Sequence, residues 1–130
     1  MTQEDKELLL KDLCGRLPYG VVTNKTCLEG SKTMAYDSVV EVADIDMLLN
    51  NSVEEIEKYH YSIKPYLRPM SSMTEEEHSR LRAAYDNGSG GLFDEYSHID
   101  WLNAHHFDFR GLIKKGLAIE VTEENNPYNK

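Results

Sequence analysis

The segment richest in aromatic side chains, residues 100–113 (DWLNAHHFDFRGLI), limits most strongly how this chain can fold. It holds the single tryptophan, two of the three phenylalanines and two of the five histidines. Because aromatic side chains bury large areas, such a segment belongs either to the centre of a small core or to a binding site. This segment contains no recognisable catalytic motif, so the sequence indicates the class of fold rather than an activity.

The chain has 130 residues, enough for one domain that buries a core without disulfides. We expect a single globular domain over residues 1–121, followed by a flexible tail over residues 122–130, where Glu, Asn and Pro predominate. Cys14 and Cys27 match no metal or redox spacing. Two scattered thiols favour a reducing cytosol, although one disulfide between them would also fit the sequence.

The first residues lack the basic and apolar regions of a secretory signal. The longest apolar run, residues 8–10, is far shorter than a membrane span. We therefore expect a soluble, cytoplasmic protein that does not bind membranes.

Acidic residues outnumber basic ones by 23 to 14, which gives a formal net charge of −9. This balance argues against direct binding to nucleic acid, which needs clustered Lys and Arg. Residues 40–57 contain no base, and their six acids are Glu41, Asp44, Asp46, Glu54, Glu55 and Glu57. Two interpretations stay open: a solvated face, or a negative patch that serves a basic partner or even mimics the phosphate backbone.

Capping residues predict several helices. Thr2 can cap the amide of Asp5 and start a first helix that Gly15 and Pro18 end, with a buried stripe formed by Leu10, Leu13, Cys14 and Leu17. Residues 52–55 and 74–77 each place a hydroxyl three positions before a glutamate, the pattern of a capping box. In the second of these helices His78, Leu81 and Tyr85 share a stripe, and Glu76 can pair with Arg80. We expect two further helices, capped by Ser97 and by Asp108 and reaching about His106 and Lys115, after a glycine-rich loop at residues 86–91.

Strands are expected at residues 21–28, 33–42 and 117–121, with a turn at residues 29–31. Two prolines make residues 64–69 a stiff extended connector, or alternatively a peptide-recognition edge carrying Lys64 and Arg68. The predicted fold class is α+β, with short helices packed on one face of a small, mostly antiparallel sheet. The predicted core comprises Leu10, Leu13, Leu17, Val21, Val40, Ile56, Ile63, Leu67, Leu81, Trp101, Leu102, Phe107, Leu112, Ile113 and Ile119.

Three sequence blocks resemble a family of short proteins from anaerobic gut bacteria and their prophages. The blocks are residues 8–21 (LLLKDLCGRLPYGV), residues 63–77 (IKPYLRPMSSMTEEE) and residues 100–113, in the family's order. They cover roughly a third of the chain. The resemblance implies a bacterial or phage cytoplasmic protein, and because the family brings no assigned activity, no site residue is carried over from it.

His105, His106 and Asp108 invite the hypothesis of a metal site or of acid–base catalysis. Adjacent histidines on a helix point about 100° apart, so they do not easily share one ion. His98, Leu102, His105 and His106 surround an apolar stripe, which favours packing at the edge of the core. Asp108 likewise fits a role in accepting hydrogen bonds from the amides that follow it.

The sequence contains no phosphate-binding loop, dinucleotide-binding glycine motif, serine nucleophile elbow, HExxH or CxxC motif. We therefore assign no catalytic residue, metal or cofactor. Eight tyrosines are typical of interfaces, and the favoured function is a non-enzymatic interaction or regulatory module with a protein partner. The alternatives are an acidic decoy of a nucleic-acid-binding protein and a small His/Asp-dependent or metal-dependent hydrolase. The interaction candidates are Tyr66, Arg68, Trp101, His105, His106, Asp108 and Arg110.

Overall fold

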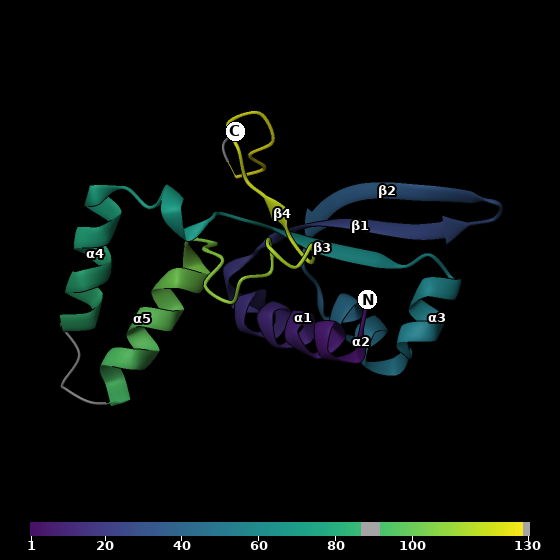
Figure 1. Cartoon of the computed structure of the whole chain (residues 1–130), viewed down its shortest axis with the longest axis horizontal. Helices are drawn as coiled ribbons and strands as arrows, with labels where there is room; N and C mark the ends of the chain where they lie inside the picture. Colours follow the sequence, from purple (N-terminus) through teal and green to yellow (C-terminus); the bar gives the residue numbers. More distant parts are fainter. Residues whose placement is uncertain (87–91, 129–130) are drawn as a thin grey trace.

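The computed structural model describes the backbone of residues 1–86 and 92–128 and, within these, the side chains outside residues 84–97. Its elements are α1 (Gln3–Arg16), η1 (Leu17–Tyr19), β1 (Val22–Glu29), β2 (Lys32–Val39), α2 (Val42–Asn50), α3 (Val53–Lys58), β3 (Ser62–Leu67), η2 (Met70–Ser72), α4 (Glu75–Asp86), α5 (Leu92–Ala104) and β4 (Ile119–Glu120). Helices α1, α2 and α3 lie on one side of the sheet (Figure 1). The predicted α+β class is confirmed.

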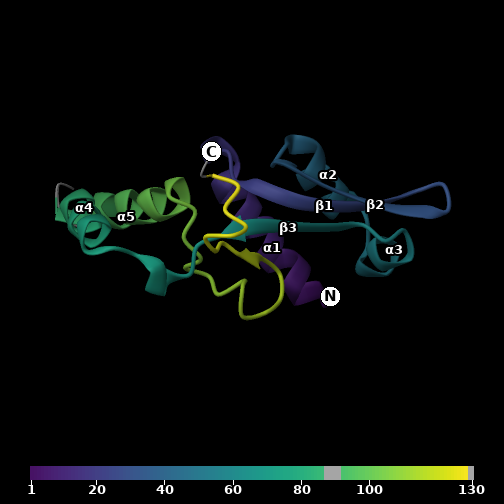
Figure 2. The same cartoon turned by 90° about the horizontal axis from the view of Figure 1, so that it is seen from above.

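The strands follow the order β2-β1-β3-β4 across the sheet. The first three are antiparallel, and the short β4 pairs in parallel with β3. At one end of the molecule the β1–β2 hairpin reaches outward, and at the other α4 and α5 form an arm directed away from the sheet (Figure 2). The sheet is therefore covered by helices on one face, while β2 forms its outer edge.

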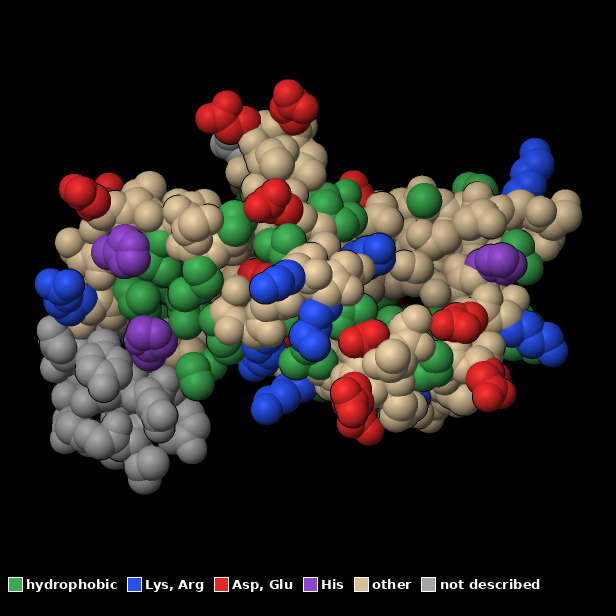
Figure 3. Space-filling view, in the orientation of Figure 1, with side chains coloured by type: hydrophobic (Ala, Val, Ile, Leu, Met, Phe, Trp, Pro, Cys, Tyr) green, Lys and Arg blue, Asp and Glu red, His purple; other side chains and the backbone are tan. Residues whose placement is uncertain are grey.

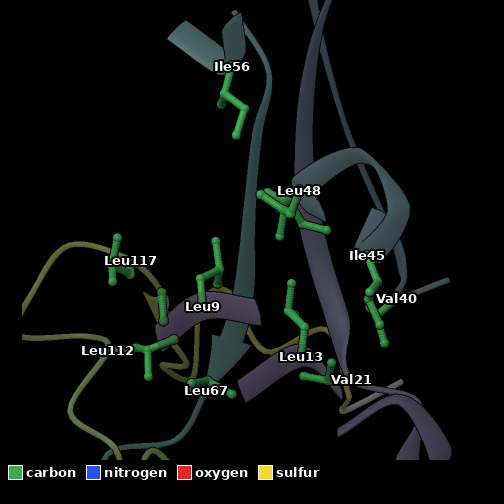
Figure 4. Packing of buried hydrophobic residues seen from close by; sticks show 12 residues of the cluster. Leu9, Leu13, Val21, Val40, Ile45, Leu48, Ile56, Leu67, Leu112 and Leu117 are labelled. Atoms are coloured by element: carbon green, nitrogen blue, oxygen red, sulfur yellow. The ribbon is translucent and has the colours of Figure 1, made fainter. Parts of the chain in front are cut away.

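The main core lies between the sheet and α1, α2 and α3 (Figure 4). Ten of the fifteen predicted core residues are buried: Leu13, Val21, Val40, Ile56, Ile63, Leu67, Leu81, Leu102, Phe107 and Leu112. The other five, Leu10, Leu17, Trp101, Ile113 and Ile119, are half-buried. The sequence did not predict the burial of Leu9, Ile45, Leu48, Met73, Leu117 and Ala118.

Helix α1 begins as predicted, because the Thr2 hydroxyl accepts a hydrogen bond from the Asp5 amide at 3.0 Å. Its predicted buried stripe is wrong by one position. The buried residues are Lys6, Leu9, Asp12, Leu13 and Arg16, whereas Cys14 is exposed. The spacing is that of an ordinary amphipathic helix, but two of the inward positions carry charges that pair with each other. The usual expectation that charged side chains of a helix face the solvent therefore led to the neighbouring stripe of α1 as the buried one.

The predicted strand 33–42 is too long, because β2 ends at Val39 and Val42 opens helix α2. The Glu41 amide donates a hydrogen bond to the Asp44 carboxylate at 2.8 Å, which stabilises the first turn of this helix. Ile45 and Leu48 then enter the core at helical spacing. The β-branched valines favoured a strand locally, and burial of these two side chains overrides that preference.

Residues 64–67 of the predicted connector 64–69 belong to β3 (Ser62–Leu67), an inner strand of the sheet. The extended conformation is as expected, but the sequence did not predict the pairing. Pro65 lies opposite Thr23 on β1. The ladder places the backbone groups of Tyr66 towards β1 and those of Leu67 towards β4, where its carbonyl accepts from the Val121 amide. The nitrogen of Pro65, which carries no hydrogen, therefore faces the β4 side of the strand. Because the pairing of β3 with β4 begins only at Tyr66, the proline removes no hydrogen bond from the sheet.

Two predicted helices differ from the structure. Helix α5 already begins at Leu92, so Ser97 lies inside it rather than at its start. Residues 109–115 form bends and turns instead of a helix, since Gly111 adopts a φ of +77° that a helix does not allow. The capping boxes at Ser52 and Thr74 are confirmed, as is the Glu76–Arg80 pair. His78 is exposed; residues 87–91 of the predicted glycine-rich loop (86–91) and the Tyr85 side chain lie outside the described residues.

Tyr128 belongs to the segment predicted as a tail, yet it completes the sheet. Its hydroxyl accepts from the Val22 amide at 2.9 Å and donates to the Tyr66 carbonyl at 2.8 Å. Val22 and Tyr66 would be the next antiparallel pair beyond Thr23 and Pro65. The phenol therefore stands between β1 and β3 where the direct ladder bond would form, and it satisfies both backbone groups.

Tyr128→Phe should lower the free energy of unfolding by about 1–3 kcal/mol, because it keeps the ring but leaves the Val22 amide and the Tyr66 carbonyl unpaired. Urea denaturation measures the loss, and faster hydrogen exchange at the Val22 amide locates it. The matched control is Tyr59→Phe at an exposed tyrosine, which should stay within about 0.5 kcal/mol of the wild type. Equal stability of the two variants would contradict the bridging role.

Candidate functional site

Arg68 joins the end of β3 to helix α4. Its guanidinium group donates to both carboxylate oxygens of Glu77, at 2.6 and 2.7 Å. Glu77 also accepts from the Thr74 amide as part of the capping box. The hydrogen bonds from Arg68, the largest cause, lower the pKa of Glu77 to about 2. Arg68 is therefore a structural clamp, and its charge is largely neutralised by Glu77.

The aromatic residues of the 100–113 segment pack at the base of the arm. Phe107 is fully buried, with its ring 4.1 Å from the Arg68 guanidinium and 5.8 Å from the Trp101 ring. His105 stacks on Trp101 at 4.0 Å, and its Nδ1 donates to the Trp101 carbonyl at 2.9 Å. Leu81 and Met73 complete this second apolar cluster. His105 is thus held by packing and by its own helix.

The chain after α5 binds back to β3 through its backbone. The Arg68 amide donates to the His106 carbonyl at 2.7 Å, and the Asp108 amide donates to the Arg68 carbonyl at 2.8 Å. Asp108 in turn accepts from the amides of Leu112 and Ile113, at 2.8 and 3.0 Å. Both oxygens of Asp108 are therefore engaged in holding a turn, as the sequence favoured.

A buried ionic cluster connects this region to α1. Asp12 accepts from Arg16 through one oxygen and from Arg110 through the other, both at 2.8 Å. The side chains of Asp12 and Arg16 are completely buried. Arg16 also donates to the Phe107 carbonyl at 2.6 Å, and the Arg110 guanidinium lies 4.3 Å from the Phe109 ring. Arg110 is therefore part of the interior rather than a free cation.

His106 lies against the C-terminal segment. Its φ of +63° turns the chain so that its ring stacks on Tyr128 at 3.9 Å, nearly parallel. Burial, together with the nearby charge of Arg16, lowers the pKa of His106 to about 4. Burial also raises the pKa of Tyr128. The folded state therefore holds a neutral imidazole against a neutral phenol.

Two adjoining hollows open beside this stacked pair. One, of about 430 Å³, is lined by Arg68, Ala104, His105, His106, Asn126 and Tyr128. The other, of about 580 Å³, also includes Arg68 and Asn126 and is completed by residues 121–123 and Ser72. Three of the seven interaction candidates line the first hollow. Trp101, Asp108 and Arg110 serve the packing beneath it, and Tyr66 lies elsewhere, donating to Asp37 at 3.0 Å.

The geometry of this region gives little support to a metal site or a catalytic site. Among the described residues, no three His, Cys, Asp or Glu side chains are close enough to hold a metal. His105 and His106 share the hollow, but Asp108 is committed to backbone amides. Cys14 and Cys27 are free thiols. None of the helices in the described part of the chain is long and apolar enough to cross a membrane.

The acidic run at residues 40–57 is partly used inside the molecule. Asp44 pairs with the buried Lys25 at 2.8 Å, and Glu55 caps the Ser52 amide. Glu57 pairs with the N-terminal amine at 3.2 Å. Acidic side chains on the face shown in Figure 3 are spread over several elements, with basic side chains between them. At least three of the six carboxylates in the run are therefore engaged within the molecule.

The outer edge of β2 is the most open surface of the sheet. Every residue of this strand except Ser38 is exposed. Its exposed apolar side chains include Met34 and Tyr36, at 46% and 52%, and Val39. The Val40 amide donates to Val21, which fixes the register: even-numbered residues of β2 bond to β1 and odd-numbered ones face outward. The backbone groups of Thr33, Ala35 and Asp37 therefore point away from β1.

Sequence reasoning did not single out this edge. A strand was predicted over residues 33–42, but whether a strand is central or at an edge depends on the order of the whole sheet. No local signal settles this, since a strand from later in the chain could also have paired with β2. Family models, curated proteins and solved structures gave no match to this chain.

Replacing Asp12 tests the buried ionic cluster. Asp12→Ala leaves the guanidinium groups of Arg16 and Arg110 without their shared carboxylate, and we expect a loss of about 3–5 kcal/mol in the free energy of unfolding. Glu76→Ala, which breaks an exposed pair with Arg80, should cost less than about 1 kcal/mol. Urea denaturation of both variants provides the measurement. Similar small losses in both would show that the buried cluster does not anchor α1.

Protonation of His106 should destabilise the fold. Because its folded pKa of about 4 lies below the ordinary value of 6.5, the unfolded chain binds the proton more tightly. The stability due to neutral His106 is complete above pH 6.5 and is lost as the pH falls towards 4. His106→Asn, which tolerates a positive φ, should therefore lose less stability between these pH values than the wild type does.

The control for this measurement is His78→Asn at an exposed histidine of α4, which should keep the wild-type pH dependence. Melting temperatures at several pH values are sufficient for the comparison. An unchanged slope in His106→Asn would assign the acid sensitivity to other groups.

Proposed function

We propose that this protein is a non-enzymatic interaction module that binds an extended segment of a partner protein along the edge of β2. One observation carries the proposal: β2 is an edge strand whose outward backbone groups and apolar side chains are both exposed. An added strand gains affinity from main-chain hydrogen bonds and selectivity from alternate side chains.

The chemistry of the edge supports a protein partner. Thr33, Ala35 and Asp37 offer amides and carbonyls at the spacing of a strand, while Met34 and Tyr36 offer contact area on the α2 side. Lys32 is the one basic side chain on β2 and lies at its first position. The strand therefore carries little of the lysine protection that natural edges use against pairing.

A catalytic role has less support. Both oxygens of Asp108 bind amides, and His105 is bonded to its own helix. The acidic decoy also has less support, because half of the acidic run is engaged in capping or ion pairs. The resemblance to gut-bacterial and prophage proteins, and with it a cytoplasmic location, remains a proposal.

A random-peptide display library selected on the immobilised chain tests the proposed function. Selected peptides should bind the wild type and lose at least about tenfold in affinity for Met34→Lys/Tyr36→Lys, which places charges beside the edge. They should also slow hydrogen exchange at the amides of Thr33, Ala35 and Asp37. The control is Val42→Lys, an exposed position on α2. Peptides that bind the double variant undiminished, or a library that yields none, would refute the proposal.

A further inference from the structure

The outward edge of β2 is complementary to itself. We propose that it pairs with the β2 edge of a second copy of the chain, antiparallel and with Ala35 opposite Ala35 of the second copy. The inference rests on the proposed function, since it names the extended partner segment as β2 itself. It uses the exposed strand shown at the margin of the sheet in Figure 1.

The backbone selects this register. Only odd-numbered residues of β2 face outward, so a hydrogen-bonded pair must join odd to odd. Centred on Ala35, three outward residues find partners: Ala35 meets Ala35, and Thr33 meets Asp37 in both directions, while Val39 lies opposite Ser31 of the turn. A shift by two residues one way pairs Asp37 with Ser31 in the turn. A shift the other way pairs Thr33 with Val39, whose carbonyl already accepts from Lys25 at 3.1 Å.

Side chains agree with the same register. Directly opposed residues share a face, so Met34 lies against Tyr36 of the second copy, and the two-fold axis repeats the contact. These two side chains are exposed at 46% and 52% in the single chain, and a sulfur beside an aromatic ring is a favourable contact. On the other face the Thr33 hydroxyl meets the Asp37 carboxylate, and the small Ala35 side chains meet at the axis.

Charge sets the strength of the pairing. Each copy carries a formal net charge of −9, so two copies repel each other at long range. Salt screens this repulsion while leaving the short backbone contacts in place. The association is therefore expected to depend on protein concentration and to strengthen with added salt, the opposite of a contact held by ion pairs.

Sedimentation velocity of the full chain over about a hundredfold range of concentration measures the association. The mean mass should rise from one chain towards two, and more so at high salt. Met34→Lys, and separately Ala35→Pro, which removes an outward amide not used by β1, should remain monomeric. Val42→Lys should associate like the wild type, and circular dichroism checks that each variant folds. A dimer that persists in both edge variants would overturn the proposal.

Disulfide trapping tests the register in a chain that carries Cys14→Ser and Cys27→Ser. Added Ala35→Cys places two thiols across the axis, at about 5.5 Å between Cα atoms, within disulfide range. Added Thr33→Cys faces Asp37 instead and should cross-link far less under the same oxidant. Equal or reversed yields would refute this register. A chain that stays monomeric throughout but still binds library peptides at β2 would refute self-pairing alone, whereas a chain that does neither would also refute the proposed function.

Discussion

The carboxylate of Asp12 is the point on which the arrangement of this molecule depends. It is completely buried and accepts from Arg16 of its own helix and from Arg110, 98 residues away. Because a buried charge without a partner is costly, α1 and the turn around residue 110 can occupy only positions that keep both guanidinium groups in place. Arg16 extends the constraint to Phe107, whose ring contacts Arg68, and Arg68 holds α4 through Glu77. A single acid thus links the helical layer to the arm.

Local signals in the sequence were sufficient for what depends on local structure. The helix starts at Thr2, Ser52 and Thr74 are as predicted, because a capping hydroxyl and its amide lie within one turn. The burial of Asp12 and Arg16 could not be predicted in the same way. Their partner Arg110 is distant in sequence, and without it the rule that charges face water selects the wrong stripe of α1. Helix α2 was missed for a related reason: the contacts of Ile45 and Leu48 with the core outweigh the strand preference of the valines before it.

The aromatic segment at residues 100–113 was expected to belong to a core or to a site, and its contacts are largely internal. His105 and His106 do line a common hollow. Asp108, however, accepts hydrogen bonds from backbone amides, and Arg110 pairs with Asp12. The most open surface of the sheet instead lies on β2, which no residue pattern marks as unusual. Whether a strand lies at an edge depends on the order of the strands in the sheet. Here β2 is at the edge because β3, which itself contains Pro65, pairs with the other side of β1. Residue types alone therefore indicated which side chains could take part in binding or catalysis, but not which of them are exposed.

The phenol of Tyr128 between β1 and β3 also bears on how fast this chain folds. The contacts that close the structure join residues separated by 91, 98 and 106 positions: Arg16 to Phe107, Asp12 to Arg110, and Val22 to Tyr128. Such distant contacts lose loop entropy before they gain energy, so they form late and slow the overall reaction. The capped helices and the β1–β2 hairpin need only local contacts and are expected to form first. During that interval the β3 side of β1 is open as well as the β2 edge, and the chain is at its most prone to aggregation.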